Sequence, residues 1–187
     1  AAGGLAQNQG LELYQSIDER SAAFLALGLG TCTNKACAVI TTSGSAVANL
    51  LPAAVEADRS CRPLLLITAD RPYRLKNCGA NQTVNQEDFI FSVCRSFCQT
   101  PKRGIHLINS LNLNELVDFA WDKAHQFPGP VHVNVPLEEP LHPCEKEQDE
   151  VWNGWSPVDF FNNCDQEKII TQEHFKNVED YFEFFPD

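Results

Sequence analysis

The sequence predicts an α/β fold with three layers, in which helices cover both faces of a parallel sheet. Short, continuous apolar runs such as ACAVITT (36–42) and RPLLLITAD (62–70) are typical of strands that are buried on both faces. Segments rich in alanine and leucine alternate with these runs, and alternating strands and helices favour a parallel sheet. Ligands bind outside the carboxyl ends of such strands, so the polar residues that follow each strand are the candidate site.

The predicted elements follow one another along the chain. We expect strands at short apolar runs and helices where apolar residues recur three or four positions apart. Asp18 or Ser16 is expected to cap the first helix, and Asn112 or Asn114 the last. The strands are expected at 11–17, 36–42, 62–70 and 130–135, the helices at 21–29, 46–57 and 114–127, while 92–100 and 104–108 fit either type.

Composition and charge exclude several classes of protein. Hydrophobic residues make up 43% and charged residues 21% of the 187, which is ordinary for a globular chain. No apolar run approaches the roughly 18 residues that a membrane span requires. The net charge of -11 argues against nucleic acid or an anionic membrane surface as a partner. The N-terminus lacks the layout of a signal peptide, and the absence of methionine suggests a piece of a longer chain.

The eight cysteines include no C-x-x-C pair. Cys94 and Cys98 are spaced for one helix face, with His106 downstream, but a zinc site requires a second tight pair. We therefore expect no metal site and reduced thiols, as in a cytoplasmic protein.

Acidic residues are concentrated at the C-terminal end. Residues 144–187 contain 12 acidic residues and three lysines, while residues 1–143 are almost neutral. The same acidic segment is rich in aromatic residues, which a purely solvated tail would not need. We expect one domain at 1–143 and, at 144–187, a linker toward a further domain.

Two candidate groups follow the first two predicted strands. Glu19 opens a helix, and its spacing alone favours an interaction with the helix dipole over a catalytic role. Ser43 and Gly44 form a tight turn whose small residues let the backbone approach a flat ligand. The turn lacks the lysine of a P-loop and the spacing of G-x-G-x-x-G, so it predicts phosphate binding only weakly.

A third group follows the strand that ends at Asp70. Arg71, Asn81 and Gln82 are expected at the same edge of the sheet. Arg71 suits a bidentate carboxylate ligand, although a surface ion pair with Asp70 explains it equally well. Asn81 and Gln82 are equally well explained as turn residues.

The order of several motifs resembles a known family. Together they are similar to the pyrimidine-binding (Pyr) domain of thiamine-diphosphate enzymes, and more narrowly to the 2-succinyl-5-enolpyruvyl-6-hydroxy-3-cyclohexene-1-carboxylate synthase (MenD) family. The resemblance covers roughly residues 11–143. The motifs are IDERSAAFLALGLG, ITTSGSAVANLLPAAVEA, LLLITADRP, CGANQTVNQ and GPVHVNVPLEEPL.

The resemblance implies a cofactor site for thiamine diphosphate. Glu19 matches the glutamate that hydrogen-bonds N1′ of the aminopyrimidine and favours its imino tautomer, which makes it a catalytic residue. Ser43 and Gly44 match the turn that lies against the aminopyrimidine. Asn49 is the last residue of the TSG-x-x-x-x-N element, which is shared more widely among thiamine-diphosphate enzymes.

The resemblance also implies a substrate site. Gln82 matches a catalytic glutamine that reaches the thiazolium ring and the bound intermediate. Arg71 and Asn81 match positions that line the substrate pocket, where Arg71 would hold a substrate carboxylate. The family decarboxylates 2-oxoglutarate and joins the product to isochorismate in menaquinone or phylloquinone biosynthesis, in the cytoplasm or, in a photosynthetic eukaryote, the plastid.

Parts of the family pattern are missing from this sequence. The SPGSRS strand that opens the family's domain is absent, and so is the GDG motif of the diphosphate module. The resemblance therefore implies that another domain, from another subunit of a homodimer or homotetramer, supplies the ligands of the diphosphate and Mg²⁺. The chain alone should be inactive. Two alternatives remain: another thiamine-diphosphate enzyme, of the acetolactate synthase or 2-oxoacid decarboxylase type, and a Pyr-like module without catalysis.

Overall fold

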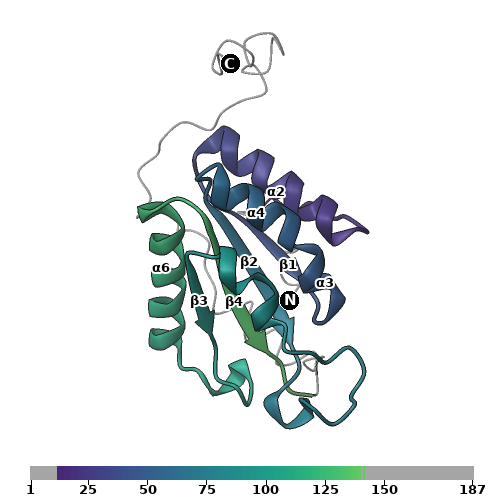
Figure 1. Cartoon of the computed structure of the whole chain (residues 1–187). Helices are drawn as coiled ribbons and strands as arrows, with labels where there is room; N and C mark the ends of the chain where they lie inside the picture. The colour runs from purple at the N-terminus through teal and green to yellow at the C-terminus, as the bar shows by residue number, and fades with distance from the viewer. Residues whose placement is uncertain (1–11, 140, 142–187) are drawn as a thin grey trace, which may run out of the picture. The chain divides into compact units, whose positions relative to one another are not determined.

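A parallel sheet forms the centre of the part of the chain that the computed structural model describes, residues 12–139 and 141. Its four strands have the order β1-β2-β4-β3, and every neighbouring pair is parallel (Figure 1). This confirms the predicted α/β class. The strands are β1 (Cys37–Thr41), β2 (Leu64–Asp70), β3 (Ser96–Gln99) and β4 (Pro130–Pro136).

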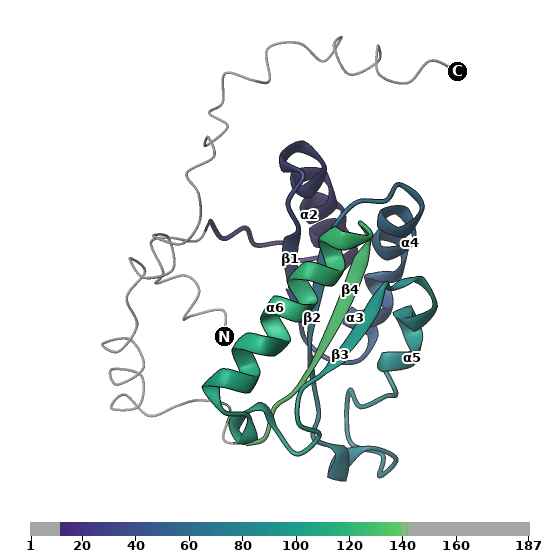
Figure 2. The same ribbon diagram turned by 90° about the vertical axis from the view of Figure 1, so that its left-hand side faces the viewer.

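Helices cover both faces of this sheet. Two of them, α2 and α4, lie together on one face, and α6 lies on the other (Figures 1 and 2). Each face has its own apolar cluster, one around Val39 and Leu66 under α2 and α4, the other around Val131 and Val133 under α6. The helices are α2 (Glu19–Thr33), α3 (Ser45–Asn49), α4 (Leu51–Arg59), α5 (Glu87–Ile90) and α6 (Ser110–Gln126), and short 3₁₀ turns lie at Tyr73–Leu75, Phe91–Val93 and Ile105–Leu107.

The start of α2 is set by Asp18. Its carboxylate accepts a hydrogen bond from the backbone N–H of Ser21 at 2.7 Å, which satisfies a donor that the helix leaves free. Asp18, one of the two predicted caps, is therefore the N-cap residue. The helix runs from 19 to 33, longer than the predicted 21–29, and ends where Asn34 adopts a left-handed conformation.

Three predictions about local structure are wrong. Residues 12–17 form no strand, because no neighbouring strand pairs with them in the described part of the chain. The helix expected at 46–57 is divided into α3 and α4, since Pro52 has no N–H to continue the helical hydrogen bonds. The cap of α6 is Asn109, whose Oδ1 accepts from the N–H of Asn112 at 2.8 Å.

The ambiguous stretches are also defined. Residues 92–100 contain the end of a 3₁₀ turn followed by β3, and residues 104–108 contain another 3₁₀ turn. Among the described helices, none has the length and apolar character needed to span a membrane. The acidic segment at 144–187 lies outside the described residues.

Candidate functional site

Glu19 is the first residue of α2, and the residue is partly buried. Asn49, the last residue of α3, donates a hydrogen bond from Nδ2 to Glu19 Oε2 at 3.1 Å. Because Asp18 caps the helix, the Glu19 carboxylate is not needed for that task. Glu19 Oε1 accepts no hydrogen bond from the described residues, so the carboxylate keeps an oxygen for a ligand.

The turn at Ser43 and Gly44 is held by Gln82. Ser43 Oγ donates to the carbonyl oxygen of Gln82 at 3.0 Å, and Gln82 Nε2 donates to the carbonyl oxygen of Ser43, also at 3.0 Å. Gly44 has φ +80°, and a Cβ at this position would lie 2.8 Å from Gln82 Cγ. The turn therefore requires glycine for both its conformation and its packing against Gln82.

The turn and the carboxylate are close to each other. Gly44 is the N-cap residue of α3, and Asn49 is the last residue of the same five-residue helix. At a rise of 1.5 Å per residue, the two ends of this helix lie within about 8 Å. The structure therefore brings together the predicted residues Glu19, Ser43, Gly44 and Asn49, with Gln82 beside them.

Asn81 and Gln82 form an exposed corner of the loop after β2. Gln82 is in the left-handed region, with φ 57°, and Thr83 Oγ1 donates to the carbonyl oxygen of Asn81 at 3.2 Å. Both side chains are on exposed residues. Asn81 directly precedes Gln82, which holds the Ser43–Gly44 turn, but among the described residues the Asn81 side chain makes no hydrogen bond to the turn.

Arg71 does not form the ion pair with Asp70 that the sequence suggested as one alternative. Its backbone N–H donates to Asp70 Oδ1 at 2.8 Å, but Asp70 Oδ2 pairs with Lys76 Nζ at 3.1 Å instead. The guanidinium forms no ion pair within the described residues, and Arg71 Nε is buried without a hydrogen-bond partner there. The guanidinium is therefore free to meet an anion.

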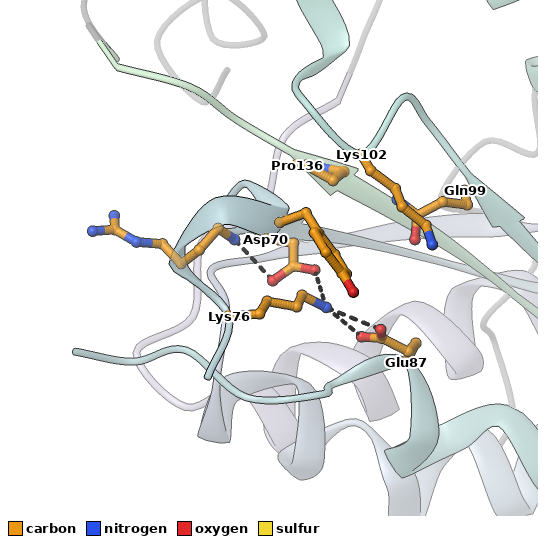
Figure 3. Close-up of a pocket in the computed structure, with 8 residues that line it drawn as sticks. Asp70, Lys76, Glu87, Gln99, Lys102 and Pro136 are labelled. Carbon is orange, nitrogen blue, oxygen red and sulfur yellow. Dashed lines mark hydrogen bonds and ion pairs between the residues drawn. The ribbon is translucent and has the colours of Figure 1, made fainter. Parts of the chain in front are cut away.

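Lys76 is buried between two carboxylates at the edge of a small cavity of about 30 Å³ (Figure 3). Its side chain is only 8% exposed, and Nζ lies 3.1 Å from Asp70 Oδ2 and 2.7 Å from Glu87 Oε2. Burial opposes the charge, but the hydrogen bonds that Nζ donates to Glu87 and Asp70 outweigh it and raise the pKa of Lys76. The same contact outweighs burial at Glu87 and lowers its pKa. This pairing fixes the loop after β2.

Behind these residues lies a buried polar network that the sequence analysis did not find. Gln86 and Asn134 are fully buried, and Gln86 Nε2 donates to Asn134 Oδ1 at 2.8 Å. Thr68 Oγ1 also donates to Asn134 Oδ1, at 3.0 Å, and lies 2.7 Å from His132 Nε2. The polar residues His132 and Asn134 alternate with valines inside a strand that is buried on both faces, and this pattern was the available signal.

The zinc pattern considered in the sequence comprises Cys94, Cys98 and His106, which all lie within the described residues. The described residues contain no cluster of three or more histidine, cysteine, aspartate or glutamate side chains arranged to hold a metal ion. Burial raises the pKa of the Cys94 thiol to about 12, so this cysteine is a poor nucleophile and a poor metal ligand. All six cysteines in the described range are free thiols.

Comparison with known proteins gives a consistent result. Residues 2–89 match the family described as the thiamine pyrophosphate enzyme, N-terminal TPP binding domain. The chain is 62% identical over 157 residues to the 2-succinyl-5-enolpyruvyl-6-hydroxy-3-cyclohexene-1-carboxylate synthase of Prochlorococcus marinus (strain MIT 9313), covering 84% of this chain and 27% of that protein. It is 61% identical over 158 residues to the same synthase of Synechococcus sp. (strain WH7803), with the same coverage of both chains.

The parallel α/β sheet and the family match together show that this chain has the N-terminal domain of a thiamine pyrophosphate enzyme. Within that class, the chain belongs to the 2-succinyl-5-enolpyruvyl-6-hydroxy-3-cyclohexene-1-carboxylate synthase family. It spans about a quarter of the length of the curated relatives that it matches.

The described residues fit one end of thiamine diphosphate. A carboxylate with a free oxygen and a turn without a side chain suit a flat aminopyrimidine ring that carries hydrogen-bonding nitrogens. The described residues offer no comparable set for the other end, because they contain no acidic cluster that could hold the metal ion of a diphosphate. The fit is therefore to the pyrimidine.

Proposed function

We propose that this chain forms the pyrimidine-binding side of a thiamine-diphosphate-dependent synthase that decarboxylates 2-oxoglutarate and adds the resulting carbon unit to isochorismate. The observation that carries the proposal is the hydrogen bond between Asn49 and Glu19, at the end of a short helix that begins at the Gly44 turn. High identity to synthases of this name supports the choice of substrates.

In this proposal Glu19 exchanges a proton with a ring nitrogen of the pyrimidine. Asn49 binds one oxygen of the carboxylate and so directs the other toward the ligand. The Ser43–Gly44 turn supplies a surface without a Cβ at its tip, against which a flat ring can lie. Bound thiamine diphosphate supplies the group that stabilises a carbanion, and the protein supplies orientation and proton transfer.

Arg71, Asn81 and Gln82 serve the substrates. Both proposed substrates carry carboxylates, and the unpaired guanidinium of Arg71 has the planar fork that binds a carboxylate with two hydrogen bonds. Gln82 lies against the turn, so it is placed to contact both cofactor and substrate. Asn81 offers an exposed amide beside it.

The remaining parts of the enzyme lie outside this chain in our proposal. A diphosphate-binding domain of another subunit, in a homodimer or homotetramer, would hold Mg²⁺ and the diphosphate. The chain by itself would then be inactive, because it offers one side of the site. The pathway is menaquinone or phylloquinone biosynthesis, and the expected location is the cytoplasm, or the plastid in a photosynthetic eukaryote.

The test is an assay of the full-length protein with thiamine diphosphate and Mg²⁺. We expect release of CO₂ from 2-oxoglutarate that depends on isochorismate, and no release by the 187-residue chain alone. Turnover of pyruvate in place of 2-oxoglutarate would favour an acetolactate synthase or a 2-oxoacid decarboxylase. No turnover of any 2-oxoacid would favour a module without catalysis.

A further inference from the structure

Gln86 connects the candidate site to the sheet. This residue is fully buried, immediately before α5, and its Oε1 accepts a hydrogen bond from the backbone N–H of Gly44 at 3.0 Å. Its Nε2 donates in the other direction, to Asn134 Oδ1 at 2.8 Å and to the carbonyl oxygen of Ala69 at 2.9 Å. One side chain thus joins the turn to the ends of β2 and β4.

The sheet side of this connection is itself fixed. Asn134 is fully buried, and its Nδ2 donates to Asp70 Oδ2 at 2.8 Å. Asp70 is also almost fully buried and pairs with Lys76. Moving Gln86 would leave several buried polar groups unpaired, and such groups are costly to leave without partners. The side chain of Gln86 is therefore held firmly on the side that faces the sheet.

The site side leads to the residues that the proposed function uses. Gly44 is the N-cap residue of α3, and Asn49 at the other end of α3 binds Glu19. Gln82, four residues before Gln86, donates to the carbonyl oxygen that precedes Gly44. The position of the Gly44 N–H thus affects the turn, the helix and the carboxylate together.

We propose that Gln86 is a positioning residue for the pyrimidine-binding turn. It fixes the Gly44 peptide, and through α3 it sets where Asn49 holds the Glu19 carboxylate, without touching the cofactor itself. This inference rests on the proposed function and adds a specific residue to it. Small displacements of positioned groups slow catalysis strongly, by roughly 10²-fold for about 1 Å, so the effect should be measurable.

Three variants separate positioning from simple stability. Gln86→Met keeps the length of the side chain and removes every hydrogen bond that the amide makes. Gln86→Glu keeps an acceptor for the Gly44 N–H. The matched control is Gln99→Leu, because Gln99 Oε1 accepts from Asn134 Nδ2 at 3.2 Å in the same network but has no contact with the turn.

The first readout is hydrogen exchange at the Gly44 amide in the 187-residue chain, which needs no cofactor. We expect exchange about tenfold faster in Gln86→Met, as for the loss of one buried hydrogen bond, and near-normal exchange in Gln86→Glu and Gln99→Leu. The second readout is the full-length protein with thiamine diphosphate. There Gln86→Met should slow exchange of the C2 proton of bound cofactor roughly tenfold to a hundredfold, and Gln86→Glu should restore part of the rate.

Two results would overturn the inference. Normal Gly44 exchange in Gln86→Met would show that the side chain does not hold the turn. Equal effects of Gln86→Met and Gln99→Leu on C2 exchange, in samples matched for folded protein by a denaturation curve, would show a purely structural role. If the unmodified full-length protein fails to exchange the C2 proton at all, the proposed function fails instead, and the Gly44 measurement still tests the contact.

Discussion

Asn49 Nδ2 donates to Glu19 Oε2 across 3.1 Å, although the two residues are thirty positions apart in the chain. This contact joins the start of α2 to the end of α3. The neighbouring carboxylate, Asp18, already caps α2 through the N–H of Ser21. The two adjacent acids therefore have separate tasks. Asp18 caps the start of the helix, whereas Glu19 is held in place by a side chain and has one carboxylate oxygen without a hydrogen bond from the described residues.

The glycine turn should tolerate no side chain. Gly44→Ala places a Cβ 2.8 Å from Gln82 Cγ at φ +80°, so we expect a loss of unfolding free energy of about 2–3 kcal/mol. Gly79→Ala is the matched control, because Gly79 has φ +76° but open space around the position. It should cost about 1 kcal/mol. Urea denaturation of both variants measures this, and equal losses would contradict the account of the turn.

The buried ammonium of Lys76 should be important for stability. Lys76→Met leaves the carboxylates of Asp70 and Glu87 without their cation, and we expect the unfolding free energy at neutral pH to fall by about 2–4 kcal/mol. Lys102→Met is the control, since Lys102 is exposed and lies over the Tyr73 ring at 5.3 Å. It should change stability by about 0.5 kcal/mol or less. A Lys76 variant as stable as the control would show that the pairing contributes nothing.

Stability should depend on pH through His132. Burial lowers the pKa of His132 from its ordinary value of 6.5 to about 4, although the charge of Glu87 opposes the shift. As the pH falls below 6.5 the unfolded chain gains this proton first, so the folded state loses stability down to about pH 4, on the order of 3 kcal/mol in total. Denaturation curves between pH 5 and 7 should show this slope in the unmodified chain and in His106→Gln, which changes an exposed histidine. The slope should flatten in His132→Leu, and an unchanged slope would count against a buried neutral histidine.

Arg71 should affect substrate use more than cofactor binding. Arg71→Lys in the full-length protein keeps the charge but removes the planar fork that matches a carboxylate. We expect kcat/KM for the carboxylate substrates to fall by an amount equivalent to about 1–3 kcal/mol, typical of a charged hydrogen bond, with little change in thiamine diphosphate affinity. Weaker cofactor binding with unchanged substrate kinetics would show that Arg71 belongs to the cofactor-binding part of the site instead.

The main layers of the fold could be predicted because apolar runs and alternation are local signals. β1, β2 and β4 fall within a few residues of their predicted ranges. The segment at 12–17 could not be judged in this way, because a strand needs a partner that its own sequence does not reveal. The break at Pro52 was visible in the sequence, but the strong alanine pattern around it favoured one continuous helix.

The site residues that follow strands could be predicted from the sequence, whereas the residues whose role depends on their burial could not. Ser43, Gly44 and Gln82 lie together as their positions suggested. Gln86 and Lys76 gave no signal, because an amide or an ammonium in a polar loop looks the same whether it faces water or the core. Only the packing of the loop after β2 against the sheet shows that both are buried.

The most direct test of the central claim is the exchange of the C2 proton of bound thiamine diphosphate in the full-length protein. Glu19→Gln keeps the shape of the side chain and removes its acid–base function, so we expect exchange roughly 10²–10⁴-fold slower. Asp18→Asn, a substitution at the adjacent helix cap, should leave exchange unchanged, because that side chain bonds the backbone of α2. Unmodified exchange in Glu19→Gln, with altered folding stability instead, would contradict a catalytic role for Glu19 and return it to an interaction with the helix dipole.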